Sequence, residues 1–143
     1  AVATQMADHL SKSGGAALVI DYGHMRSALG DTLQAMIRHR HCPITEKPGE
    51  ADITSHVDFE ALGRACVQGG ARVAGLMTQG DFLTAMGLEA RTEVLARTIS
   101  GEARTQFLAA SERLAHPGQM GHLFKVMAVT SAGVPPPYPF GEQ

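Results

Sequence analysis

The sequence has no tryptophan, and aromatic residues make up only 5% of its 143 positions. A protein that stacks nucleic-acid bases needs aromatic side chains, and one that follows a phosphate backbone needs an excess of positive charge. The formal net charge here is −2. We therefore expect no nucleic-acid partner.

Long apolar runs are missing as well. No stretch approaches the roughly 20 apolar residues that cross a bilayer, and the N-terminus lacks the charged-then-apolar pattern of a secretory signal. The two cysteines, Cys42 and Cys66, could form at most one disulfide, so the fold does not depend on a disulfide framework. These absences predict a soluble, cytoplasmic protein without a membrane partner.

Common catalytic motifs are also lacking. The sequence contains no Gly-x-Gly-x-x-Gly or Walker loop and no Gly-x-Ser-x-Gly turn. Local motifs therefore predict neither a nucleotide-binding loop nor a nucleophilic serine for acyl transfer. Of the seven histidines, His39 and His41 share a loop with Cys42, and His56 stands two residues before Asp58. None has the Cys-x-x-Cys or His-x-x-x-His spacing typical of zinc ligands, so we expect no metal site.

What the sequence does contain is a short apolar run that ends in polar residues. Residues 16–20 read Ala-Ala-Leu-Val-Ile, too few for a helix, and they predict a strand buried on both faces, as in the parallel sheets of α/β proteins. Asp21, Tyr22 and His24 follow directly. Ligands of open α/β sheets bind beyond the carboxyl ends of the strands, so these three side chains are candidate site residues.

Periodicity predicts the remaining elements. Helices are expected at 2–12, 31–38, 59–68, 82–86 and, in two parts that break near Ser100-Gly101, 88–115. Further strands are expected at 71–78 and 123–130. Ser55 or Asp58 could cap the helix at 59–68, and Asp81 the helix at 82–86. Residues 39–50 read as a polar loop, and residues 135–139 as an extended polyproline strap or loose end.

Three more polar residues belong to the predicted carboxyl edge of the sheet. His56 and Asp58 precede the helix at 59–68, and Gln79 follows the strand at 71–78. A carboxylate or a neutral imidazole at this edge could hold a guanidinium or an amine, or take its proton. The alternative stays open that His56 and Asp58 only satisfy backbone donors at a helix start and that Tyr22 is a packed ring.

Five segments occur in an order that is specific to one family. They are 15–24, 31–35, 48–59, 79–83 and 119–126. Together they resemble the carboxyl-terminal half of the MidA family of S-adenosylmethionine-dependent methyltransferases, whose mitochondrial members are arginine methyltransferases that act in respiratory complex I assembly. The resemblance extends over nearly the whole chain.

This resemblance implies an α/β fold, the C-terminal part of a class I, Rossmann-like methyltransferase sheet. It has three strands with inserted helices: 16–21 would be the fifth strand of the full sheet, 71–78 the sixth and 123–130 the antiparallel seventh. Residues 1–143 would then form the C-terminal portion of one domain, with a helical insertion at 88–115 and a proline-rich tail at 131–143.

The implied function is methyl transfer from S-adenosylmethionine to a protein side chain such as arginine. We expect Asp21, His56 and Asp58 to be catalytic and Tyr22, His24 and Gln79 to bind the substrate. The cofactor-binding residues are expected in an N-terminal half that this fragment lacks, so the fragment alone should be inactive. Expected partners are that half and a protein substrate, and a homo-oligomer stays open. The alternative is a noncatalytic assembly or binding module that uses the same surface.

Overall fold

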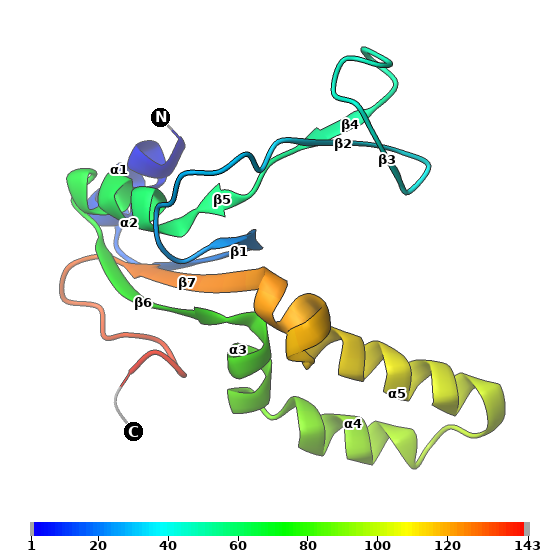
Figure 1. Ribbon diagram of the computed structural model, residues 1–143. Helices are drawn as coiled ribbons and strands as arrows, with labels where there is room; N and C mark the ends of the chain where they lie inside the picture. The colour runs from blue at the N-terminus through cyan, green and yellow to red at the C-terminus, as the bar shows by residue number, and fades with distance from the viewer. Residues whose placement is uncertain (1, 142–143) are drawn as a thin grey trace.

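The computed structural model describes residues 2–141 and has a four-stranded sheet at its centre (Figure 1). The helices are α1 Val2–Ser13, α2 Phe59–Gln68, α3 Gln79–Ala85, α4 Leu88–Ala96, α5 Gly101–Ala115 and the π-helical turn η1 Pro117–Gly121. The strands are β1 Ala16–His24, β2 Gln34–Ile37, β3 Arg40–Cys42, β4 Asp52–Thr54, β5 Val57–Asp58, β6 Arg72–Thr78 and β7 Phe124–Thr130. No helix within residues 2–141 is both long and apolar enough to cross a membrane.

The central sheet has the strand order β5-β1-β7-β6. β7 is antiparallel to β1 and to β6, so those two strands are parallel to each other and end at the same edge. Helices α3, α4 and α5 and the turn η1 all lie between β6 and β7 in the chain. This arrangement confirms the expected antiparallel last strand and the helices inserted before it.

The buried strand of this sheet is β7, and the expectation that β1 is buried on both faces is wrong. Residues 126–130 of β7 are at most 1% exposed, whereas Leu18 and Ile20 of β1 are 51% and 52% exposed. Within residues 2–141, β1 pairs with β7 from Ala16 to Tyr22 but with β5 only at Gly23 and His24. Among the described residues, none therefore fully covers one apolar face of β1 or pairs with most of one of its edges.

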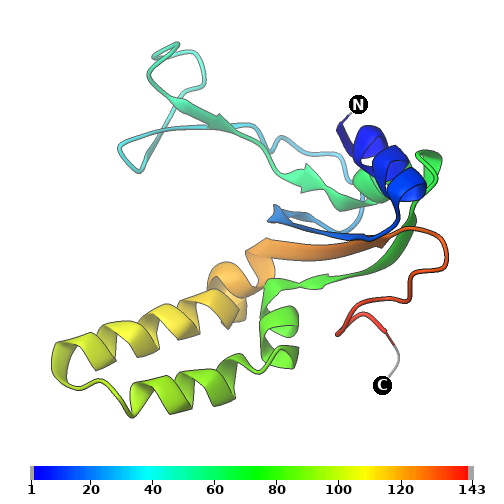
Figure 2. The ribbon, with the colours of Figure 1, turned by 180° about the vertical axis from the view of Figure 1, so that it is seen from behind.

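Helices α1 and α2 cover the opposite face of the sheet and form the core with it (Figures 1 and 2). Phe59 and Cys66 on α2 are fully buried against Ala7 of α1 and Met127 of β7. The N-cap of α2 is Asp58, whose carboxylate accepts a hydrogen bond from the backbone N–H of Ala61 at 2.9 Å. That contact settles the choice between Ser55 and Asp58.

The segment 31–38 is not the helix that was predicted. It contributes β2 to a small antiparallel sheet of order β3-β2-β4, which projects from the body as an arm (Figure 1). Arg38 and His39 form the turn between β2 and β3 with positive φ angles of 50° and 63°. A two-residue hairpin with positive φ at both positions is the type I′ turn, which usually contains asparagine and glycine, so the sequence held no signal for it.

The helices between β6 and β7 follow the prediction closely, with one change of cap. α3 begins at Gln79 and is capped by Thr78, whose hydroxyl accepts from the Asp81 N–H, so Asp81 is not the cap. α4 and α5 then form a helical hairpin that projects on the same side as the arm, as both views show (Figures 1 and 2).

The proline-rich tail is a strap over β6 and α3. Phe140 stacks on Phe82 with ring centroids 6.0 Å apart, and the Tyr138 hydroxyl donates to the Ala85 carbonyl at 2.8 Å. A side chain at Gly75 would meet Phe140 at 2.5 Å, so glycine is required there for the strap to lie close. The last two residues of the predicted tail, 142–143, lie outside the described residues.

Candidate functional site

Five of the six predicted site residues gather where β1 ends beside β5. In parallel register, Gly23 pairs with Val57 and His24 with Asp58. A side chain at Gly23 would stand 2.1 Å from the Val57 carbonyl oxygen, so glycine permits the close approach of the two strands. β1 therefore continues to His24, whereas the sequence predicted that it ends at Asp21.

Alternation along β1 divides these residues between the two faces of the sheet. Tyr22 and His24 share the exposed face of Leu18 and Ile20, whereas Asp21 points to the opposite face. One carboxylate oxygen of Asp21 accepts a hydrogen bond from the Tyr22 N–H at 2.8 Å. The tyrosine and the aspartate thus reach the strand end from different faces of the sheet.

Tyr22 is the centre of an aromatic group. Its ring makes edge-to-face contacts with His56, at a centroid distance of 5.6 Å, and with Phe124, at 5.7 Å. Edge-to-face geometry is the favourable arrangement for such rings because the positive edge of one meets the negative face of the other. Phe124 was not among the predicted site residues. Its position opposite Tyr22 follows from the β1–β7 register, which sequence patterns do not reveal.

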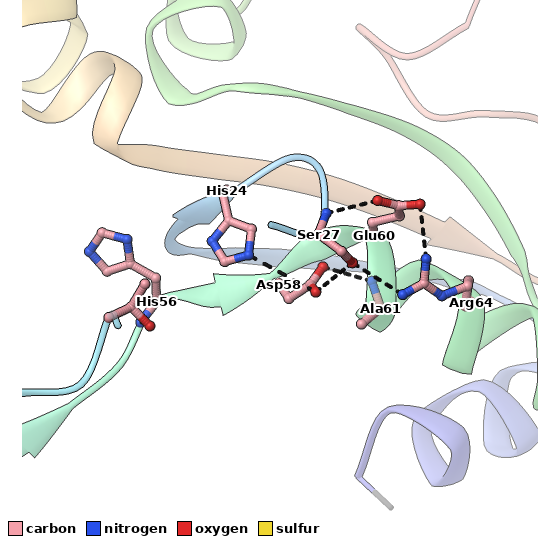
Figure 3. A network of polar contacts seen from close by, with 8 residues as sticks. His24, Ser27, His56, Asp58, Glu60, Ala61 and Arg64 are labelled. Atoms are coloured by element: carbon pink, nitrogen blue, oxygen red, sulfur yellow. Dashed lines mark hydrogen bonds and ion pairs between the residues drawn. The ribbon is translucent and has the colours of Figure 1, made fainter. Parts of the chain in front are cut away.

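A polar network fixes the loop after β1 to the start of α2 (Figure 3). The Ser27 hydroxyl donates to Asp58 Oδ2 at 2.6 Å, and the Ser27 N–H donates to Glu60 at 2.8 Å. Arg64 binds Glu60 at 2.9 Å and donates to the Ser27 hydroxyl at 3.1 Å. The four-residue spacing of Glu60 and Arg64 indicates a helical ion pair, but nothing in the sequence connects that pair with Ser27.

Asp58 is occupied by this network. The hydrogen bond from Ser27 is the main cause that lowers the pKa of the Asp58 carboxyl, followed by the bond from the Ala61 N–H. His24 Nε2 lies 4.0 Å from Asp58 Oδ2, which allows an ion pair when the imidazole is protonated. Asp58 is therefore an ionised helix cap that can also orient His24.

Lys125 is a buried cation beside the site. Its Nζ donates to the carbonyls of Gly23 at 2.8 Å and Leu123 at 3.2 Å, and also to that of His122. Burial lowers the pKa of this lysine. The lysine ties the end of β1 to the start of β7, and no sequence signal distinguished it from any other lysine.

Gln79 lies apart from the other predicted residues. It follows β6, which is separated from β1 by β7, so two strand spacings of about 10 Å in total lie between them. The side chain is 8% exposed, and its Nε2 donates to the Leu114 carbonyl at 2.8 Å. In this structure Gln79 holds the end of α5.

The chain resembles known proteins over most of its length. Residues 1–77, more than half of the chain, match the model of a family described as "Putative S-adenosyl-L-methionine-dependent methyltransferase". The chain belongs to this family. The match confirms the predicted methyltransferase resemblance.

Relatives in this methyltransferase family carry more specific names. "Protein arginine methyltransferase NDUFAF7, mitochondrial" of Homo sapiens is 34% identical over 87% of the chain, and its homolog in Drosophila melanogaster is 37% identical over 87%. The chain corresponds to the carboxyl-terminal part of such proteins and spans 28% of the length of each of these two. Their mitochondrial names contradict the predicted cytoplasmic location.

A solved structure supports the assignment of the fold. A Burkholderia thailandensis protein bound to S-adenosyl-homocysteine superposes with a TM-score of 0.70 and 31% identity, covering 89% of this chain and 35% of that protein. The predicted α/β methyltransferase fold is thereby confirmed.

Two features that often hold a nucleotide-type cofactor or a metal ion are missing from residues 2–141. Within residues 2–141, the glycine pairs at 14–15 and 69–70 end helices α1 and α2, and no glycine-rich turn leads from a strand into a helix. No group of three histidine, cysteine, aspartate or glutamate side chains among these residues is placed to hold a metal ion. What the chain offers is a set of polar and aromatic side chains at one strand end.

Proposed function

We propose that this chain forms the acceptor-binding side of an S-adenosylmethionine-dependent methyltransferase that methylates a protein side chain such as arginine. The observation that carries the proposal is the family match, together with relatives that are named protein arginine methyltransferases. The cofactor supplies the methyl group, and its contacts come from chain outside the residues described here. The names of the relatives also favour a mitochondrial location.

The acceptor face is the one that Tyr22, His24 and His56 share. The Tyr22 ring, flanked by His56 and Phe124, offers an aromatic surface on which a planar guanidinium can stack. Asp58 orients His24 through their 4.0 Å contact. These residues would position the acceptor nitrogen, which is the main demand that methyl transfer places on the protein.

A proton acceptor is also required, because an acceptor nitrogen that gains a methyl group must lose a proton. The His56 imidazole fits this role best. Its ring contacts the Tyr22 ring. The hydrogen bond from His56 to the Thr32 hydroxyl, at 3.3 Å, comes from the backbone N–H and does not use the imidazole nitrogens. Asp58 is less suited because both of its oxygens already accept hydrogen bonds.

We expect Asp21 to contribute more to acceptor binding than Gln79. Asp21 has one carboxylate oxygen bound to the Tyr22 N–H, and its second oxygen can bind a guanidinium that reaches the strand end from the other face. Gln79 can reach an acceptor only if it releases the Leu114 carbonyl. We therefore expect Gln79 to affect substrate binding least.

Calorimetric titration with S-adenosylhomocysteine tests the proposal. The longest reading frame that contains this chain should bind one molecule per protein, and residues 1–143 alone should bind none. Binding to neither protein would contradict the methyltransferase account and favour a noncatalytic binding module. Binding to residues 1–143 alone would contradict the claim that the cofactor contacts lie elsewhere.

A further inference from the structure

The helical hairpin of α4 and α5 has little to stabilise it within the chain. None of the 15 residues of α5 is buried, and Ala96 is the buried residue of α4. Helices of 9 and 15 residues are marginal in water unless tertiary contacts cover an apolar face. A hairpin that projects this far from the sheet therefore needs a further contact (Figure 2).

A groove of about 760 Å³ runs between α4 and α5, and Thr84 of α3 also lines it. Its apolar lining comes from Leu88 and Ala96 on α4 and from Leu108 and Ala115 on α5. Leu88 and Ala96 are eight residues apart and Leu108 and Ala115 are seven apart, about two helical turns in each case, so the two apolar residues of each helix lie on the side that faces the groove. An apolar groove between two helices is a common docking site for the apolar side of another helix.

Charges in the groove are separated along the length of the hairpin. Glu89 and Glu112 line the end near the sheet, and within residues 2–141 neither forms an ion pair. Arg97 and Arg104 line the far end, where Arg104 Nε donates to the Ala96 carbonyl at 3.2 Å. Arg97, the C-cap of α4, is balanced by Glu93 at 2.5 Å, so Arg104 is the main uncompensated cation among the described residues at that end.

We propose that this groove binds the helical hairpin of a second copy of the chain, related by a two-fold axis. Two hairpins packed antiparallel bring the acidic end of each groove against the basic end of the other, so that Glu112 of one copy faces Arg104 of its partner. A two-fold interface repeats every contact twice, which makes the pattern self-complementary. The dimer extends beyond the proposed methyl-transfer function and does not depend on it.

Sedimentation equilibrium of residues 1–143 tests the proposal through a charge swap. Arg104→Glu and Glu112→Arg each place like charges opposite each other twice in the dimer, so each should raise the dissociation constant at least about tenfold. The double variant restores opposite charges and should return the dissociation constant to within about threefold of the original value. Rescue by the double variant is an effect that simple destabilisation would not produce.

The matched control is the swap Glu102→Arg with Arg113→Glu, two positions of α5 that do not line this groove. These variants, singly and together, should leave dimerisation unchanged, and circular dichroism should show native helix content in all of them. A chain that stays monomeric at all concentrations would overturn the proposal and leave the groove to a helix of another protein. Dimerisation that ignores the charge swap would overturn it too, and would point to another surface such as the open edge of β1.

Discussion

β1 and β7 are hydrogen-bonded neighbours of similar apolar composition, yet only one of them is interior. Residues 126–130 are at most 1% exposed, and β7 has a paired strand along each edge, β1 on one side and β6 on the other. Leu18 and Ile20 stay about half exposed, because β1 lacks a second partner over most of its length within residues 2–141. Burial is thus decided by position in the sheet, and an apolar run alone does not reveal it.

The exposed face of β1 continues into the candidate site. The side chains that follow Leu18 and Ile20 on that face are Tyr22 and His24, which belong to the proposed acceptor face. Large exposed apolar residues in a row mark surfaces that contact something else. β1, which has an exposed apolar face, is therefore also the strand that carries the candidate site.

Truncation of one residue in each strand should give the largest difference. Met127→Ala leaves a cavity in the core and should reduce the free energy of unfolding by about 2–5 kcal/mol. Leu18→Ala removes a half-exposed side chain and should reduce it by less than about 1.5 kcal/mol. Urea denaturation of residues 1–143 measures both. Equal losses would mean that β1 is covered in solution.

The hydrogen bonds by which Lys125 links β1 to β7 should have the second-largest effect on stability. Lys125→Met leaves the buried Gly23 carbonyl without its side-chain donor, and each lost partner of this kind costs about 1–3 kcal/mol. The exposed Lys12, paired with Asp8 on α1, is the matched control, and Lys12→Met should cost at most about 0.5 kcal/mol. A neutral Lys125→Met would show that β1 and β7 hold together without this lysine.

The same variant has a signature in the pH dependence of stability. Burial lowers the pKa of Lys125 below 10.5, so between the folded and the unfolded pKa the unfolded chain binds more protons. Stability from this group should therefore rise as pH increases through that interval. Lys125→Met should remove that rise, and an unchanged pH profile would contradict it.

The helix that starts at the end of β6 provides a smaller test. Thr78→Ala removes the side-chain cap of α3 and should lower stability by about 1 kcal/mol. Ser100 is the natural control, because it precedes α5 without making a side-chain cap bond, and Ser100→Ala should change stability by only a few tenths of a kcal/mol. Thermal unfolding compares the two variants, and equal losses would refute the assigned cap.

At the end of β1, Ser27→Ala should have the smallest effect. The Ser27 hydroxyl lowers the pKa of Asp58 below its usual 3.8, so its stabilising contribution is present above pH 3.8 and disappears as pH falls through the folded pKa. The variant should be less stable than the original at neutral pH, and the difference should shrink in strong acid to what the hydrogen bond from Arg64 to Ser27 contributes. A difference as large in strong acid as at neutral pH would contradict the assignment.

Local patterns predicted the elements that have strong signals. The helices α2, α4 and α5 and the strands β6 and β7 appear close to their expected residues, because periodicity and glycine stops act locally. The arm at 34–54 was missed because its turn at Arg38 and His39 has residues that type I′ turns rarely use. The strand predicted at 16–21 continues to His24, because Gly23 lets β1 approach Val57 closely.

The sequence predicted where the candidate site lies, but not all of the residues that belong to it. The rule that sites lie beyond the carboxyl ends of strands predicted that these polar residues lie close together, and the structure places Tyr22 against His56 and His24 beside Asp58. Opposite faces for Asp21 and Tyr22 follow from alternation, but the separation of Gln79 depends on the insertion of β7 between two parallel strands. Contacts with Phe124 and Lys125 depend on strand register, which a single sequence does not specify.

The most direct test of the acceptor face measures methyl transfer. The longest reading frame that contains this chain is incubated with labelled S-adenosylmethionine and a mitochondrial protein extract, and methylarginine is quantified after hydrolysis. His56→Gln should lower the rate by about a hundredfold, whereas His9→Gln, on the exposed surface of α1, should leave it unchanged. A His56→Gln protein as active as the original would contradict the account.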